Sequence, residues 1–201
     1  MSSTDLPQLA TVQDAVVTSV EWLVEPCWTG DRLMARFEGG KVALSDPLGA
    51  PTPNAELATQ LVRAIDAEQA VIDGIWTSMP FIGEPHDDDR QTFVAWDLVE
   101  LDGQLLHDLP LLERRRLLGS VLAVRGNVRI SPAVRPPIDG SLAGWQAIGC
   151  THIIAKHVNS RYRPGETSSQ WLKIGLVRKT QPSLIDLLLG HRQPKIPHIS
   201  D

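Results

Sequence analysis

Two adjacent glycines, Gly39 and Gly40, constrain the fold of this chain more than any other short feature. They separate two short runs of strand-forming residues, 32–37 and 41–45. A Gly-Gly link between such runs is typical of a β-hairpin, because glycine adopts the positive φ angles that the tightest hairpin turns require. The pattern therefore predicts neighbouring antiparallel strands, which favours a mixed fold over a doubly wound parallel sheet.

Further strands alternate with helices at irregular intervals. One expected strand begins at Trp22, and further strands are expected at 70–76, 92–98, 151–156 and 170–177. Helices are expected at 12–19, 55–67, 111–122, 142–148 and 182–189. This mixture predicts the α+β class. The chain has 201 residues, of which 42% are hydrophobic, enough for one large core or for two lobes around a cleft. We expect one domain over 1–180, followed by a helix and a loose tail over 181–201.

Composition and charge narrow the classes of function. A formal net charge of −5 argues against a surface that binds nucleic acid all over, although basic residues at 161–179 leave room for a local patch. The acidic segment 84–89 is typical of a solvated loop, because consecutive carboxylates point in different directions. No apolar run approaches the roughly 20 residues of a membrane span, and no secretion signal precedes the domain, so we expect a cytoplasmic protein without membrane partners. The widely separated Cys27 and Cys150 predict reduced thiols.

Several blocks of sequence resemble the motifs of ATP-dependent DNA ligases, in the same order. The segment 25–32, Glu-Pro-Cys-Trp-Thr-Gly-Asp-Arg, resembles the first motif, Glu-Pro-Lys-x-Asp-Gly-x-Arg. Later motifs and the helix after the third are matched by 93–98, 101–103, 110–115, 149–156, 160–165 and 171–174. The resemblance covers most of the chain and implies the DNA-ligase and mRNA-capping type of nucleotidyltransferase fold, with two antiparallel sheets flanked by helices around an ATP cleft.

The resemblance also implies a reaction, in which a lysine attacks the α-phosphate of ATP and the resulting lysyl-AMP is passed to a DNA 5′-phosphate. The positions that would start this reaction, bind the metal or serve the nucleotide are changed in this chain. They are Cys27 for the nucleophilic lysine, Thr29 for an aspartate, Asp46 for an arginine, Ile75 for a glutamate, and Thr151 with His152 for a Glu-Gly pair. We therefore expect no catalytic residue and no metal ligand, and little affinity for magnesium.

Other positions match the family's nucleotide contacts. They are Glu25 and Gly30 in the first motif, Arg32 as the ribose contact, Trp96 as the base-stacking aromatic, and Lys156 and Lys173 as phosphate-facing lysines. With no GxGxxG or GxxxxGK[ST] loop, ATP or AMP would have to be held by such side chains. The residues alone leave structural roles open: Trp96 as a core side chain, Gly30 as a turn, and Arg32 and Lys156 as solvated cations.

The sequence leaves several functions open. The first is a degenerate ligase-like domain that binds nucleotide, nucleic-acid ends or a DNA repair partner. The second is an active DNA ligase or nucleotidyltransferase of repair or recombination, with its nucleophile relocated to Cys27 or Lys41. The third is a protein-interaction scaffold whose cleft is filled by side chains such as Ile75 and His152. A zinc site of Cys27, Cys150 and His152 is a weaker alternative.

Two further points follow from the sequence. The residues after Ile174 are too few for the OB-fold with which ligases close over DNA. Nothing in the sequence indicates an oligomeric state or names a partner.

Overall fold

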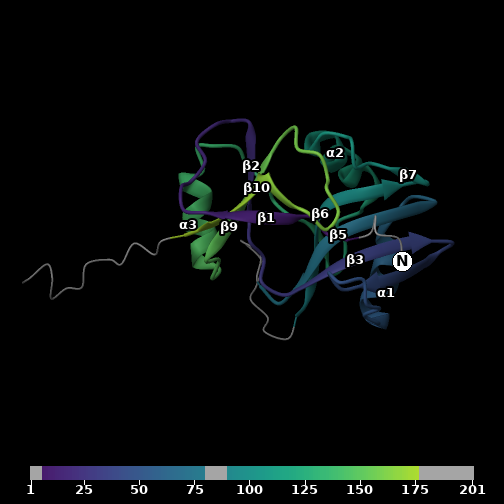
Figure 1. Ribbon diagram of the computed structural model, residues 1–201. Coiled ribbons are helices and arrows are strands. Elements are labelled where there is room, and N and C mark those ends of the chain that lie inside the picture. Colours follow the sequence, from purple (N-terminus) through teal and green to yellow (C-terminus); the bar gives the residue numbers. More distant parts are fainter. Residues whose placement is uncertain (1–5, 80–89, 177–201) are drawn as a thin grey trace, which may run out of the picture.

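The computed structural model describes residues 6–79 and 90–176 (Figure 1). These residues form ten strands and three helices. In chain order they are β1 (Leu9–Gln13), β2 (Trp22–Pro26), β3 (Asp31–Glu38), β4 (Lys41–Ser45), α1 (Ala55–Ala64), β5 (Gln69–Thr77), β6 (Thr92–Leu101), β7 (Gln104–Leu105), α2 (Leu111–Val121), β8 (Val128–Ile130), α3 (Asp139–Ala147), β9 (His152–His157) and β10 (Thr167–Gly175). The acidic segment 84–89, the expected helix at 182–189 and the tail lie outside the described residues.

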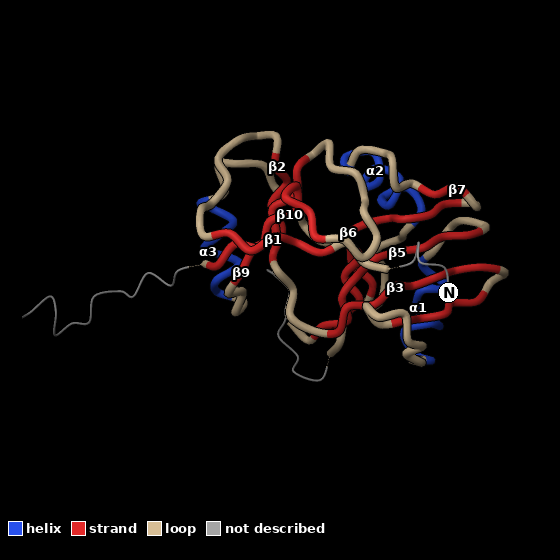
Figure 2. The backbone as a smooth tube through the Cα atoms, viewed as in Figure 1, coloured by secondary structure: helices blue, strands red, loops and turns tan. Residues whose placement is uncertain are grey.

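The strands form two sheets, of which one is flanked by one helix and the other by two (Figures 1 and 2). Sheet A has the order β1-β10-β9-β2, and sheet B has the order β4-β3-β5-β6-β7 with β8 beside β6. Helix α3 lies by sheet A, whereas α1 and α2 lie by sheet B. The two flanked sheets confirm the predicted α+β fold. The expectation of two purely antiparallel sheets is wrong, because β1 pairs with β10 in parallel and β8 pairs with β6 in parallel.

The hairpin predicted from Gly39 and Gly40 is confirmed. Their φ angles are 56° and 73°, and the strands on either side pair as Glu38 with Lys41. Two positive φ angles in a two-residue loop match the twist of antiparallel strands, and glycine adopts them without steric cost. This hairpin makes β4 one edge of sheet B.

Helix α1 covers one face of sheet B, as its amphipathic pattern predicts. It begins after Asn54, whose side-chain oxygen accepts a hydrogen bond of 3.0 Å from the Leu57 backbone N–H. Leu57 and Leu61 are fully buried against the alternate residues of β3, such as Ala35. The main hydrophobic core therefore lies between sheet B and its helices, and the opposite face of sheet B is left to meet sheet A.

The helix expected at 12–19 is wrong. Leu9–Gln13 is strand β1, which pairs in parallel with β10, and the following residues form bends and a turn. β-branched residues are frequent in this segment, and their restricted χ1 angles favour extended backbone. The short strands β7 and β8 were not expected, and helix α3 begins at Asp139, before the predicted 142.

Candidate functional site

The space between the two sheets brings together most of the residues that match nucleotide contacts. In sheet A, Lys156 pairs with Trp171, and Ile154 pairs with Glu25 on one side and Lys173 on the other. Directly paired residues of antiparallel strands share one face, so these side chains lie on the same side of sheet A. Sheet B contributes Arg32 and Ile75, which also pair directly, and Trp96 from β6.

Lys156 lies at the centre of this interior. Its side chain is 0% exposed, and its Nζ atom lies 3.2 Å from Glu25 Oε1. The ammonium also lies 4.5 Å from the ring centroid of Trp96 and 4.2 Å from that of Trp171, within range of cation–π attraction. Burial lowers the pKa of Lys156, and the Glu25 carboxylate opposes this shift. The alternative of a strand-end lysine facing water is wrong.

Glu25 holds a second cation, Arg115 of helix α2. Arg115 Nη1 lies 3.2 Å from Glu25 Oε1, and the same guanidinium donates to the backbone oxygens of Trp96 at 3.2 Å and Ser131 at 2.7 Å. Sequence reasoning did not single out Arg115, which is 90 residues away from Glu25 in the chain. Its neighbour Arg114 is fully buried in a two-bond pair with Asp97, at 2.8 Å for each bond.

Arg32 is bound to Asp73 rather than solvated. Its Nε and Nη2 atoms donate to the two Asp73 oxygens at 3.0 and 2.6 Å, and its guanidinium carbon lies 4.9 Å from the Trp96 ring centroid. Burial alone would lower the pKa of Arg32, but the Asp73 carboxylate outweighs it and raises that pKa. Asp73 also accepts a hydrogen bond of 2.8 Å from the Tyr162 hydroxyl. Burial, and next Asp73, raise the pKa of Tyr162, so this hydroxyl stays a donor.

Trp96, the expected base-stacking ring, is only 6% exposed. Two cations, Arg32 and Lys156, lie over it, and Trp171 meets it edge to face at 6.4 Å. It belongs to a buried apolar cluster, against which Cys27 packs, formed by Trp28, Ile75, Val94, Trp96 and Ile154. Four of the six predicted nucleotide contacts, Glu25, Arg32, Trp96 and Lys156, are therefore linked by direct contacts to one another.

Cys27, which the motif resemblance matches to the nucleophilic lysine, lies just after β2. Its backbone N–H donates to the His152 carbonyl oxygen at 3.0 Å, and the Cys150 thiol donates to the same oxygen at 2.7 Å. Both cysteines are free thiols. Burial raises the pKa of Cys27, while the nearby Lys173 ammonium lowers it, and the net shift is upward. At neutral pH the Cys27 sulfur is therefore a thiol, a weaker nucleophile than a thiolate.

The other changed positions have local structural roles. Asp46 Oδ1 accepts hydrogen bonds from the backbone N–H groups of Leu48 at 2.8 Å and Ala50 at 2.9 Å, which stabilises the turn after β4. Thr29 is exposed, and Thr151 Oγ1 lies 3.0 Å from His152 Nδ1. The His152 imidazole thus contacts Thr151, whereas its backbone oxygen accepts from the Cys27 backbone N–H and the Cys150 thiol.

Gly30 occupies a backbone position where a side chain would clash with the neighbouring strand. Its φ angle is 149°, and a Cβ atom added there would lie 2.2 Å from the Trp76 carbonyl oxygen. Because both the backbone strain and the clash must be relieved, Gly30→Ala is expected to lower the free energy of unfolding by about 2–3 kcal/mol. Gly40→Ala is the matched control, since its φ is also positive but no atom lies within 4 Å of the added Cβ. Equal losses in urea unfolding of the two variants would contradict the close approach at Gly30.

The carboxylates of this interior are already neutralised. Glu25 faces Lys156 and Arg115, Asp73 faces Arg32, and Asp97 faces Arg114. Residues 6–79 and 90–176 contain no group of three or more His, Cys, Asp or Glu residues that could hold a metal ion. In the same residues, no helix is long and apolar enough to cross a membrane.

Lys41, the other candidate for a relocated nucleophile, lies far from this interior. It pairs with Glu38 at the hairpin end of β3, whereas Arg32 lies at the opposite end of that strand. At about 3.3 Å per residue, the separation along β3 is roughly 20 Å. Lys41 is also exposed to solvent. Its position therefore gives no support to a nucleophile at Lys41.

Comparison with known proteins gives consistent similarities. The family model described as "ATP dependent DNA ligase domain" matches residues 7–175. The multifunctional non-homologous end joining DNA repair protein LigD of Mycobacterium tuberculosis is 31% identical over 186 residues, which cover 83% of this chain and 23% of that protein. The chain thus spans about a quarter of the length of this relative.

Solved structures show the same similarity. The ligase domain of M. tuberculosis LigD superposes with a TM-score of 0.67 at 26% identity, covering 85% of this chain and 59% of that one. A mycobacterial DNA ligase D complexed with ATP and MES gives a TM-score of 0.68 at 26% identity, covering 86% and 60%. These neighbours share the two-sheet architecture described above.

Proposed function

Because the chain belongs to the family of ATP-dependent DNA ligase domains, we propose that it is a LigD-type adenylation domain that has lost self-adenylylation. In this proposal the cleft is closed by the chain's own side chains, and the domain acts as a scaffold that contacts a DNA repair protein or nucleic-acid ends. The repair context is taken from the printed name of the relative, an end-joining DNA repair protein.

One observation carries this proposal. Lys156, which matches a phosphate-facing lysine, is fully buried and already has an anion, Glu25, at 3.2 Å. A lysine that binds a triphosphate has to reach the cleft and keep its charge available. Here the ammonium is enclosed by Trp96 and Trp171 and compensated by a carboxylate. To bind ATP, the chain would have to break this pair and leave Glu25 with less compensation, at a cost of several kcal/mol.

The chemistry of the changed positions supports the loss of self-adenylylation. Attack on the α-phosphate of ATP needs an activated nucleophile and a metal ion to neutralise the phosphates. The Cys27 thiol has a raised pKa, and Ile75 brings an apolar side chain where the family has a glutamate. Asp73, the remaining carboxylate of that strand, is held by Arg32 and Tyr162.

Lys173 favours a second candidate, the binding of ATP or AMP without transfer. Its side chain is only partly buried, and its positive charge acts to lower the pKa of Cys27 against the effect of burial. In this candidate, a phosphate binds beside Lys173, near the C-terminal end of strand β10, while Lys156 stays paired with Glu25. The ATP held by the mycobacterial ligase D makes this candidate worth testing.

Thermal unfolding with and without ATP distinguishes the two. We expect no rise in Tm when ATP is added at millimolar concentration, with or without magnesium. A ligand at about 100 times its Kd would stabilise the folded state by about 2.7 kcal/mol, which raises Tm by several degrees in a chain of this size. A rise in Tm that Lys173→Ala removes would replace the closed-cleft proposal with the second candidate.

A further inference from the structure

Three polar side-chain atoms between the two sheets have no hydrogen-bond partner among the described residues. They are Glu25 Oε2, Lys156 Nζ and Trp96 Nε1. Glu25 and Lys156 are 0% exposed and Trp96 is 6% exposed, so bulk solvent does not satisfy these atoms. A buried polar group without a partner costs about 1–3 kcal/mol. Three such atoms in one interior indicate a partner that the described residues do not supply.

The three atoms lie close to one another. Lys156 Nζ is 3.2 Å from Glu25 Oε1, but these two atoms lack the alignment of a hydrogen bond. The second oxygen of the same carboxylate lies within about 6 Å of Nζ. The indole nitrogen of Trp96 lies within about 7 Å of Nζ, because the centroid of its ring is 4.5 Å away. One water molecule spans about 5–6 Å between two polar groups, so one or two waters can connect all three atoms.

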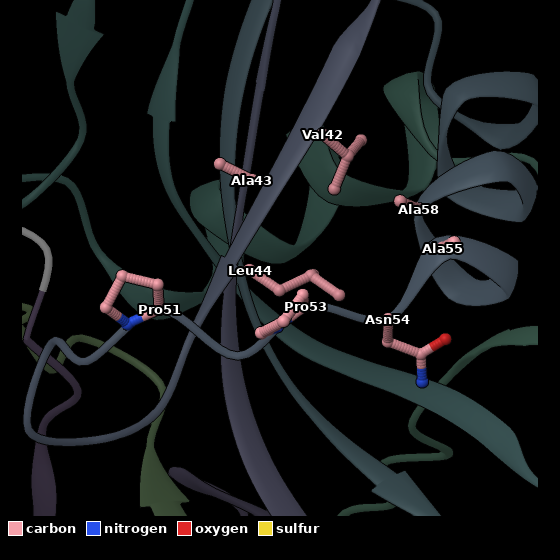
Figure 3. Close-up of a pocket in the computed structure, with 8 residues that line it drawn as sticks. All are labelled: Val42, Ala43, Leu44, Pro51, Pro53, Asn54, Ala55 and Ala58. Carbon is pink, nitrogen blue, oxygen red and sulfur yellow. The ribbon is translucent and has the colours of Figure 1, made fainter.

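Room alone does not make a polar site, as the hollow between β4 and α1 shows (Figure 3). Its volume is about 370 Å³, and Val42 and Leu44 point toward it from β4. Asn54 is the one polar side chain among its lining residues, all of which belong to the described part of the chain, and it accepts the capping bond from Leu57 N–H. A buried water needs two to four polar partners. The interior around Lys156 supplies them, whereas the lining of this hollow does not.

The chemistry of the three atoms selects water over an ion. The ammonium and the indole N–H are hydrogen-bond donors, and Glu25 Oε2 is an acceptor. A small anion would accept from both donors, but the carboxylate would repel it, and the ammonium would repel a metal cation. A water molecule accepts two hydrogen bonds and also donates to a carboxylate, so it satisfies all three atoms.

We infer that the interior between the two sheets holds at least one internal water molecule, which accepts from Lys156 Nζ and Trp96 Nε1 and donates to Glu25 Oε2. This inference rests on the closed cleft of the proposed function. The water hydrates the buried ammonium, and it binds three residues that the motif resemblance matches to nucleotide contacts. The cleft is therefore closed by water as well as by side chains.

A high-resolution crystal structure of the chain without nucleotide tests this inference directly. We expect an ordered water within about 3.2 Å of at least two of the three atoms. Density that shows no such water, or side chains turned so that these atoms bond to other groups of the chain, would overturn the inference. The result is separable from the proposed function: a rise in Tm with ATP contradicts the closed cleft, whereas a missing water with an unchanged Tm overturns the water site alone.

Oxygen-17 magnetic relaxation dispersion, which counts long-lived internal waters in solution, supplies the variant test. Lys156→Met replaces the ammonium with an apolar group, so the count should fall by at least one. Glu113→Ala is the control, because it removes an ion pair on the solvent side of α2 and should keep the count of the original chain. An equal count in Lys156→Met and Glu113→Ala would show that Lys156 holds no internal water and would overturn the inference.

Discussion

Replacing Glu25 with glutamine is expected to lower the free energy of unfolding by about 3–5 kcal/mol, because it removes one partner of a buried ion pair. Glu25 is 0% exposed, and its Oε1 lies 3.2 Å from the ammonium of the equally buried Lys156. In the variant this ammonium stays inside the protein without its counter-charge. Urea unfolding followed by circular dichroism measures the loss.

Lys156→Met supplies the control for that result. Methionine is apolar and unbranched, and it leaves Glu25 paired with Arg115, so the single variant should lie close to the original chain in stability. Combined with Glu25→Gln, it should recover at least half of the lost stability, because no buried ammonium is left alone. If Glu25→Gln costs less than about 1 kcal/mol, the interior is hydrated like an open cleft and the pair is not structural.

Replacing Asp73 with alanine is expected to cost about 3 kcal/mol. The change leaves the Arg32 guanidinium without its two-bond partner and the buried Tyr162 hydroxyl without its acceptor. The side chain of Arg32 is 17% exposed, which allows some rehydration and places the loss at the lower end of the range for broken buried pairs.

Tyr162→Phe and Glu113→Ala are the comparison variants for the stability loss of Asp73→Ala. Tyr162→Phe removes the hydroxyl, which donates to Asp73 and accepts from the Gln8 backbone N–H at 3.2 Å, and should cost about 1–2 kcal/mol. Glu113 pairs with Arg116 at 2.6 Å on the solvent side of α2, and its removal should leave Tm unchanged within error. An Asp73→Ala variant as stable as Glu113→Ala would show that Asp73 is free for another role, such as holding a metal ion.

The sequence predicts the parts of the fold that depend on short-range signals. Gly39 and Gly40 define the hairpin, and the amphipathic run at Ala55–Ala64 defines helix α1. The resemblance in the motif blocks places most candidate residues between the two sheets. By contrast, strand β1 is not predicted, and a helix is expected at 12–19 instead, because the strand partner of β1, β10, lies more than 150 residues away in the chain.

The environment of the site residues could not be read from the sequence, because it depends on distant side chains. The run Ile153-Ile154-Ala155-Lys156 fits a lysine leaving a strand into water. Its burial results from Trp96 and Trp171, which belong to β6 and β10. Arg115 likewise follows an ordinary Leu- and Arg-rich helical pattern, and only the packing of α2 brings it to Glu25.

Together, these contacts indicate a ligase-type interior in which each carboxylate lies beside a cation, while Glu25 Oε2, Lys156 Nζ and Trp96 Nε1 have no hydrogen-bond partner among the described residues. We infer that Cys27, Ile75 and Asp46, like the paired charges, have structural roles in this interior or in its turns. An apolar or turn-forming side chain stands where the family resemblance implies chemistry, while Lys156, Glu25 and Trp96 remain as parts of the core.

The proposed loss of self-adenylylation is tested most directly by incubating the chain with magnesium or manganese and ATP labelled on its α-phosphate, then denaturing the protein and measuring bound label. A protein-linked adenylate would survive denaturation. The account predicts no label on the original chain and none on Cys27→Ala or Lys41→Ala. Label on the original chain that either substitution removes would contradict it and identify the nucleophile.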